Sequence, residues 1–141
     1  TSSGTSSLAN FAIALAAADT FASEFGCVDP RVRMITTMKK CEPGLNGGWS
    51  PNGQIAAFLG ALIIALLTWS LGWLLQGGST SGAFTFIAII TIIGWLGCQI
   101  DSLRGATLEN RGLISKGQVN ALSIACGAII AWQWASFIGW P

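Results

Sequence analysis

The longest uninterrupted apolar segment, residues 55–75, places the strongest constraint on the fold. It reads IAAFLGALIIALLTWSLGWLL and contains no charged side chain. As an α-helix with a rise of about 1.5 Å per residue, it reaches roughly 31 Å, close to the bilayer hydrocarbon thickness of about 30 Å. We therefore expect this segment to cross a membrane as a helix.

Two further segments, residues 83–100 and 119–140, have the same character. The first of them is rich in β-branched residues, but an isolated strand in lipid would leave its backbone groups unpaired, so a helix is expected. The composition agrees, because 52% of the residues are hydrophobic and only 9% are charged, against about 25% charged in soluble domains. The predicted fold class is an all-α integral membrane protein with three transmembrane helices.

An N-terminal segment, residues 8–25, has an apolar core that stops at Asp19 and is too short to span a bilayer. It predicts an amphipathic helix that lies at the interface or packs along the other helices. An uncleaved secretory signal is the alternative, although the basic region that precedes such signals is missing. The start at Thr1 fits removal of either a targeting peptide or an initiator Met.

Residues 27–54 are rich in proline and glycine and predict an irregular polar loop. The expected division is therefore an N-terminal interfacial helix and polar loop over residues 1–54, followed by a three-helix transmembrane domain over residues 55–141.

The basic residues are distributed by side. The turn between the first two spans and the C-terminal tail carry no basic residue. Four basic residues precede the first span, namely Arg31, Arg33, Lys39 and Lys40. Three lie between the second and third spans, namely Arg104, Arg111 and Lys116. With three spans, all seven fall on one face of the membrane. The positive-inside rule then predicts the N-terminus on the stromal or cytoplasmic side and the C-terminus on the opposite side.

The chain contains no histidine, which excludes several kinds of chemistry. Haem b ligation, most zinc hydrolase sites and Ser-His-Asp or Cys-His catalysis all need an imidazole. No CxxC pair supports zinc or an iron–sulfur cluster, and a net charge of +1 gives no case for nucleic-acid binding. Because the spans as bounded above also bury no formal charge, we expect a protein that is not an enzyme, with a small transporter or channel component as the minor alternative.

Cys27 and Cys41 enclose a short loop and leave two alternatives open. A disulfide between them would require an oxidising compartment, whereas the predicted orientation places them on the reducing side as free thiols. Cys98 and Cys126 lie within spans and are expected to be small apolar fillers.

Small residues recur every fourth position in the first and third spans, which is typical of close helix contacts in lipid. They are Gly53, Ala57, Ala61 and Ala65 in the first span, and Gly127, Ala131, Ala135 and Gly139 in the third. These stripes predict that the helices dock on partner helices of a larger membrane complex.

A weak internal repeat relates the first and third spans. The segment Asn52-Gly53-Gln54-Ile55-x-Ala57 is echoed by Lys116-Gly117-Gln118-Val119-x-Ala121, GALIIA at 60–65 is similar to GAIIA at 127–131, and both spans close on Gly-Trp, at 72–73 and 139–140. Two similar helices around a different middle one resemble the plan of the chlorophyll-binding light-harvesting superfamily. Gln54 and Gln118 stand where that family has arginine, so its paired Glu–Arg pigment sites are not carried over.

The resemblance implies a small subunit of a photosynthetic pigment–protein assembly in the thylakoid, with chlorophyll and carotenoid as expected cofactors. A bacterial inner membrane or mitochondrial inner membrane is the alternative location, and a respiratory complex the alternative host. Magnesium in a pigment prefers oxygen or nitrogen ligands, and the candidates are Gln54, Gln99, Glu109, Gln118 and Asn120. Each is also a plausible interfacial hydrogen-bonding residue without a ligand role. The predicted function is thus a non-catalytic accessory subunit that mediates docking, with other integral membrane subunits and lipids as partners.

Overall fold

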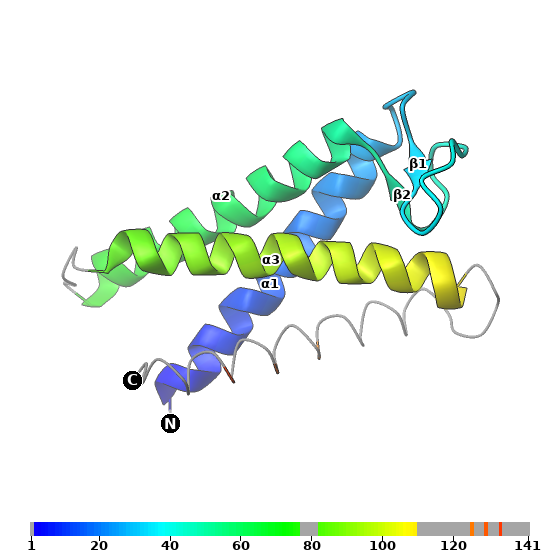
Figure 1. The fold of residues 1–141 in the computed structure, drawn as a ribbon. Coiled ribbons are helices and arrows are strands. Elements are labelled where there is room, and N and C mark those ends of the chain that lie inside the picture. Colours follow the sequence, from blue (N-terminus) through cyan, green and yellow to red (C-terminus); the bar gives the residue numbers. More distant parts are fainter. Residues whose placement is uncertain (1, 77–81, 110–124, 126–128, 130–132, 134–141) are drawn as a thin grey trace.

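The computed structural model describes residues 2–76, 82–109, 125, 129 and 133. Three long helices dominate this part of the chain: α1 (Ser2–Gly26), α2 (Pro51–Gln76) and α3 (Ala83–Arg104). Figure 1 shows α1 crossing the other two helices obliquely, with a small two-stranded element beside the C-terminal end of α1 and the N-terminal end of α2. The mainly helical character of the prediction is confirmed.

Helix α2 begins four residues before the predicted span because its first turn is capped. The Ser50 hydroxyl accepts a hydrogen bond from the Gly53 N–H at 3.1 Å, and the Ser50 carbonyl accepts one from the Gln54 N–H at 2.9 Å. Pro51 occupies the first helical position, where a missing N–H has no consequence. A serine cap followed by proline is a strong helix start.

Helix α3 continues beyond the predicted end at residue 100, through Arg104, and then passes into the π-helical turn η1 (Gly105–Glu109). Pro51–Leu74 and Ala83–Leu108 are each long and apolar enough to cross a membrane. They agree with the first two predicted spans. The third predicted span, residues 119–140, lies outside the continuous stretches that the structure describes.

Helix α1 packs along α2 and α3, the second of the two arrangements that the sequence left open. Ala14, Leu15 and Ala18 on one face of α1 are buried. Ala18 packs in a cluster with Ala57, Ala61 and Cys98, and Ala14 packs in a second cluster with Ala65 and Ile90. With 25 residues, α1 extends the helix predicted over residues 8–25 mainly at its N-terminal end.

The small residues of α2 form the inner face of this packing. Ala57, Ala61 and Ala65 are all completely buried. A Cβ placed on Gly94 of α3 would lie 3.1 Å from the Cβ atoms of Ala14 and Ala61, so the three helices meet at this level with no room for a larger side chain. The α2 stripe is therefore a contact surface for helices of the same chain, and docking on other subunits stays a prediction.

The loop between α1 and α2 contains the short strands β1 (Arg33–Met34) and β2 (Gly48–Trp49). They pair antiparallel, with Arg33 opposite Trp49 and Met34 opposite Gly48. The sequence predicted only irregular structure here, because two-residue strands have no detectable alternation of polar and apolar residues.

Candidate functional site

A cavity of about 140 Å³ lies where the C-terminal ends of α1 and α3 meet the loop before α2. Helix α1 contributes Asp19 and Ser23 to its wall, and α3 contributes Asp101 and Ser102. The loop closes it with residues 44–48, three of which are glycines. Two carboxylates from different helices therefore line one small cavity at the polar end of an otherwise apolar helix group.

The position of Asp101 is unusual for a membrane protein. Its residue exposure is only 7%, and it lies inside the candidate span Ala83–Leu108. Asp19 is partly buried and follows directly on the buried Ala18. Buried acidic side chains within candidate membrane spans are energetically costly and frequently mark a functional site.

Close packing of α1 on α3 brings these two carboxylates to the same cavity. Ala14 of α1 and Gly94 of α3 meet where the helices cross, and the Cγ of Leu15 would lie 2.8 Å from a Cβ on Gly97. Both helices continue from this crossing toward the polar loop. Asp19 and Asp101 thus follow the crossing by one to two turns each, on the faces that enclose the cavity.

The glycine segment 44–48 forms the third wall. Gly47 has φ of 79°, a left-handed conformation that favours glycine. A Cβ on Gly47 would also lie 2.7 Å from the carbonyl oxygen of Ser102, so a side chain is excluded by space as well. The Gly47 carbonyl accepts a hydrogen bond from the Ile35 N–H at 2.9 Å. The glycine at position 47 therefore lets the loop pack closely against Ser102 and Ala106 at the edge of the cavity.

A change of helix type accompanies the site. The Gly105 N–H is directed at the carbonyl oxygens of both Asp101 and Ser102, where α3 gives way to η1. Single π-helical turns occur frequently at functional sites, since they displace side chains from the regular α-helical register. Here the change begins at Gly105, which itself lines the cavity.

An ion-paired cluster holds the loop to the start of α2. The Asp29 carboxylate, which is 0% exposed, accepts hydrogen bonds from the Arg31 Nε at 3.0 Å, the Arg31 Nη2 at 3.1 Å and the Asn52 N–H at 3.1 Å. The Arg31 N–H adds a fourth at 2.9 Å. The side-chain hydrogen bonds from Arg31 are the main reason that the pKa of Asp29 is lowered from 3.8 to about 2.

Three of the predicted pigment ligands lie within the described residues, and two of them, Gln54 and Gln99, form hydrogen bonds with Trp95. Gln54 lies in the first turn of α2, where its Oε1 accepts a hydrogen bond from the Trp95 Nε1 at 3.1 Å. Gln99 is on α3 and its Nε2 donates to the Trp95 carbonyl at 3.4 Å. Glu109 ends η1, and Gln118 and Asn120 lie outside the described residues. The interfacial hydrogen-bonding alternative fits Gln54 and Gln99, and their ligand role stays a prediction.

Sequence reasoning missed Asp19 and Asp101. In the sequence analysis, Asp19 was interpreted only as the end of an apolar segment. The second predicted span ended at residue 100, one residue before Asp101. The expectation that no span buries a formal charge was therefore wrong, because α3 continues through Arg104. A detectable signal was present, since helical periodicity carried past residue 100 would have placed an acidic side chain on the packed face of Gly94 and Gly97.

The remaining predicted features have clear positions. Cys27, Cys41 and Cys98 are free thiols, so the disulfide alternative is not the state of this structure. The Thr91 hydroxyl donates to the Ile87 carbonyl at 2.7 Å and Ser70 bonds to Leu66 in the same way. These hydroxyls satisfy their own helix and do not line a polar path.

The oxygen-rich wall of the cavity is suited to a hard cation. Two carboxylates and two hydroxyls line it, and Mg²⁺ prefers oxygen ligands. Within the described part of the chain, no three His, Cys, Asp or Glu side chains are grouped so as to hold a metal ion. A cation here would thus need oxygen atoms from water or a bound molecule, which is the usual coordination of Mg²⁺ with phosphate ligands.

Comparison with known proteins identifies the family. The model of the integral membrane protein family DUF92 matches residues 3–136. The chain belongs to this family. This DUF92 match covers α1, the loop, α2 and α3 together, so the carboxylate cavity lies within the region that the family model describes.

Curated relatives of this DUF92 chain occur in distant organisms. An uncharacterized membrane protein of Methanocaldococcus jannaschii is 35% identical over 119 residues, which cover 84% of this chain and 46% of the relative. An uncharacterized membrane protein of Synechocystis is 30% identical over 115 residues, or 80% of this chain and 42% of the relative. The protein named PGR of Arabidopsis thaliana is 32% identical over 101 residues, or 69% of this chain and 35% of that protein.

The chain therefore spans less than half the length of these relatives. No solved structure matches it significantly.

Membership of DUF92 corrects the resemblance to the chlorophyll-binding light-harvesting superfamily, which was wrong. The resemblance depended on the repeat that relates the first and third predicted spans. In α2, the small residues Ala57, Ala61 and Ala65 pack against α1 and α3, a requirement that any closely packed membrane helix pair shares. Helix packing therefore accounts for these residues without a pigment.

Proposed function

We propose that this DUF92 chain binds the phosphate group of a membrane-borne molecule through a divalent cation held by Asp19 and Asp101. The observation that carries the proposal is the convergence of these two carboxylates, from two packed helices, on one cavity. Two negative charges repel a phosphate, so a cation is required before an anionic group can enter. A hard divalent cation coordinated by carboxylates and phosphate oxygens satisfies both requirements.

The place of the cavity favours a ligand that resides in the membrane. The cavity borders the loop on one side and the candidate span Ala83–Leu108 on the other. An amphiphile would reach this level with its polar head, while its apolar part stays in lipid.

The reaction class that such a site supports is phosphoryl transfer. This chemistry depends mainly on positioning and electrostatic stabilisation, so it needs neither histidine nor a protein nucleophile. The lack of histidine, from which a non-enzymatic role was predicted, therefore does not bear on this reaction. Ser23 and Ser102 line the cavity, and their hydroxyl groups would orient the head group.

Cation binding by substituted variants tests the proposal. We expect the protein in lipid nanodiscs to bind Mn²⁺, as a paramagnetic substitute for Mg²⁺, and expect Asp19→Asn or Asp101→Asn to weaken binding at least about tenfold. Glu24→Gln is the matched control, since it removes an exposed acidic group from the same helix as Asp19. Electron paramagnetic resonance of free Mn²⁺ gives the affinities. Equal affinity in all four proteins would refute the cation site.

A second measurement addresses the anionic ligand. Dodecyl phosphate should bind only when Mg²⁺ is present, and dodecyl alcohol should not bind under either condition. Phosphorus-31 NMR then detects any transfer or release of phosphate. Binding without turnover would support the site and retain the predicted non-catalytic role, whereas binding of dodecyl phosphate without cation would contradict the proposed coordination.

A second candidate is the accessory subunit of a photosystem or light-harvesting assembly in a thylakoid, with chlorophyll and carotenoid bound between subunits. Relatives in Synechocystis and Arabidopsis thaliana favour it, and a relative in an archaeon speaks against confinement to photosynthetic membranes. Purification in mild detergent, an absorption spectrum and mass spectrometry of co-purifying chains test it. Colourless protein without associated subunits would exclude this candidate and leave the first unaffected.

A further inference from the structure

A second cavity, an apolar groove of about 340 Å³, runs between α1 and α2. Phe21 and Phe25 of α1 form one wall, with their rings stacked at a centroid distance of 6.0 Å. Ile55, Leu59 and Ile63 of α2 form the other. Asp19 lies about 200° around α1 from Phe21, given 3.6 residues per turn, so the groove and the carboxylate cavity occupy opposite faces of this helix.

The groove has a polar end and an apolar end. Asn52 lines it at the start of α2, and the Asn52 Oδ1 accepts a hydrogen bond from the Arg31 Nη2 at 3.0 Å. From Asn52 to Ile63 the helix rises about 16 Å, roughly half of the bilayer hydrocarbon thickness. The groove thus has the length of one lipid leaflet, with an arginine at its water-facing end.

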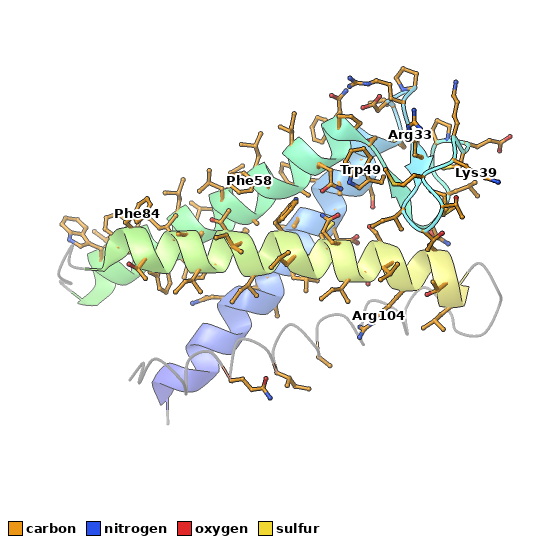
Figure 2. All side chains as sticks on the ribbon, in the orientation of Figure 1. Arg33, Lys39, Trp49, Phe58, Phe84 and Arg104 are labelled. Carbon is orange, nitrogen blue, oxygen red and sulfur yellow. The ribbon has the colours of Figure 1, made fainter. Side chains whose placement is uncertain are left out.

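Arg31 is arranged to accept a further anionic partner. Asp29 binds its Nε and Nη2, and the Nη1 group forms no hydrogen bond with any residue that the structure describes. The Arg31 side chain is 60% exposed. The same loop carries Arg33, Lys39 and Lys40 against the single exposed acid Glu42, and Figure 2 shows Arg33 and Lys39 beside this end of the helices.

We propose that the groove binds one anionic glycerophospholipid, with an acyl chain between α1 and α2 and the phosphate on the Arg31 Nη1 group. Charge decides the occupant, because a basic loop at the membrane surface attracts anionic lipid. The apolar walls provide the acyl contact. Arginine is well suited to phosphate, which it binds through directed N–H groups.

Native mass spectrometry of the full chain, released from micelles with equal phosphatidylglycerol and phosphatidylcholine, tests the proposal. We expect the bound phosphatidylglycerol to exceed phosphatidylcholine about tenfold. Arg31→Gln should abolish this preference, and Lys39→Gln, which removes one basic charge from the same loop, should change it less than about twofold. Equal losses in both variants would indicate general surface attraction and overturn the proposal.

A pair of α2 variants tests the groove without changing charge. Leu59 lines the groove and is 46% exposed, whereas Leu66 lies outside it and is 43% exposed. Leu59→Trp should fill the groove and lower total bound lipid at least about fivefold, and Leu66→Trp should leave it unchanged. Equal effects of the two would contradict the acyl site. A dimer that Leu59→Trp dissociates, with no bound lipid, would assign the groove to a second copy instead.

Discussion

At the scale of single residues, Asp29 shows how one side chain fixes the loop that closes the carboxylate cavity. Its carboxylate joins Arg31, two residues along the loop, to the Asn52 N–H in the first turn of α2. The Asp-Pro-Arg sequence places the first of these contacts in an Asx turn. Loop position and helix start therefore depend on the same ionised group.

Acidification should weaken this cluster. Because the pKa of folded Asp29 is about 2, below its ordinary value of 3.8, the ionised carboxylate stabilises the fold fully above about pH 4, and this stabilisation is lost as pH falls toward about 2. Thermal unfolding followed by circular dichroism should show a midpoint that decreases over this interval. Asp29→Asn should lower the midpoint at pH 7 and flatten its acid dependence, whereas Glu42→Gln should do neither.

At the scale of elements, small residues determine how closely the helices approach. Gly94 meets Ala14 and Ala61 in the packed crossing, while a Cβ on Gly72 near the other end of α2 would contact nothing within 4 Å. Both glycines lie in candidate membrane helices, but Gly94 is closely packed and Gly72 is open. Substitutions at these two positions therefore distinguish the effect of packing on stability from the effect of helix propensity.

Gly94→Leu should destabilise the protein by about 1–3 kcal/mol, since the added side chain has no space at the crossing. Gly72→Leu should be neutral or stabilising by up to about 1 kcal/mol, because it only improves helix propensity. Unfolding in mixed micelles with increasing denaturing detergent gives the comparison. A similar loss of stability in both variants would mean that the helices do not cross at Gly94.

At the scale of the whole molecule, the basic loop and the C-terminal end of α3 lie at the same end of the helix group. Gly47 contacts Ser102 there, and Figure 2 shows Phe84 near the opposite end of α3 from Arg104. The loop that carries Arg31 to Lys40 therefore lies at the same end of the helix group as Arg104, and the location of both on one side of a membrane stays a prediction. The compartment that this side faces stays a prediction.

Labelling with a membrane-impermeant maleimide tests this arrangement in oriented vesicles. Cys27 is exposed, so it should react from one side only. In a background with Cys27→Ser and Cys41→Ser, Leu103→Cys should react from that same side and Phe84→Cys from the other, since both positions are exposed. Reaction of Leu103→Cys and Phe84→Cys from one side would show that α3 does not cross the membrane.

The sequence was sufficient for the features that depend on helical periodicity. The first span was predicted at 55–75 against α2 at Pro51–Gln76, and the small residues Ala57, Ala61 and Ala65 were recognised as a contact stripe. Their partners were not predictable, because a stripe does not specify whether the facing helix belongs to the same chain. The carboxylate cavity was missed for a related reason: Asp19 and Asp101 are 82 positions apart, and only the crossing at Gly94 brings them together.

The segment of α1 from Asp19 to Phe25 lines both cavities, each on a different face of the helix. One face borders the carboxylate cavity and the other borders the apolar groove. Because both cavities share this stretch, we expect a substitution that displaces it to change binding in both of them.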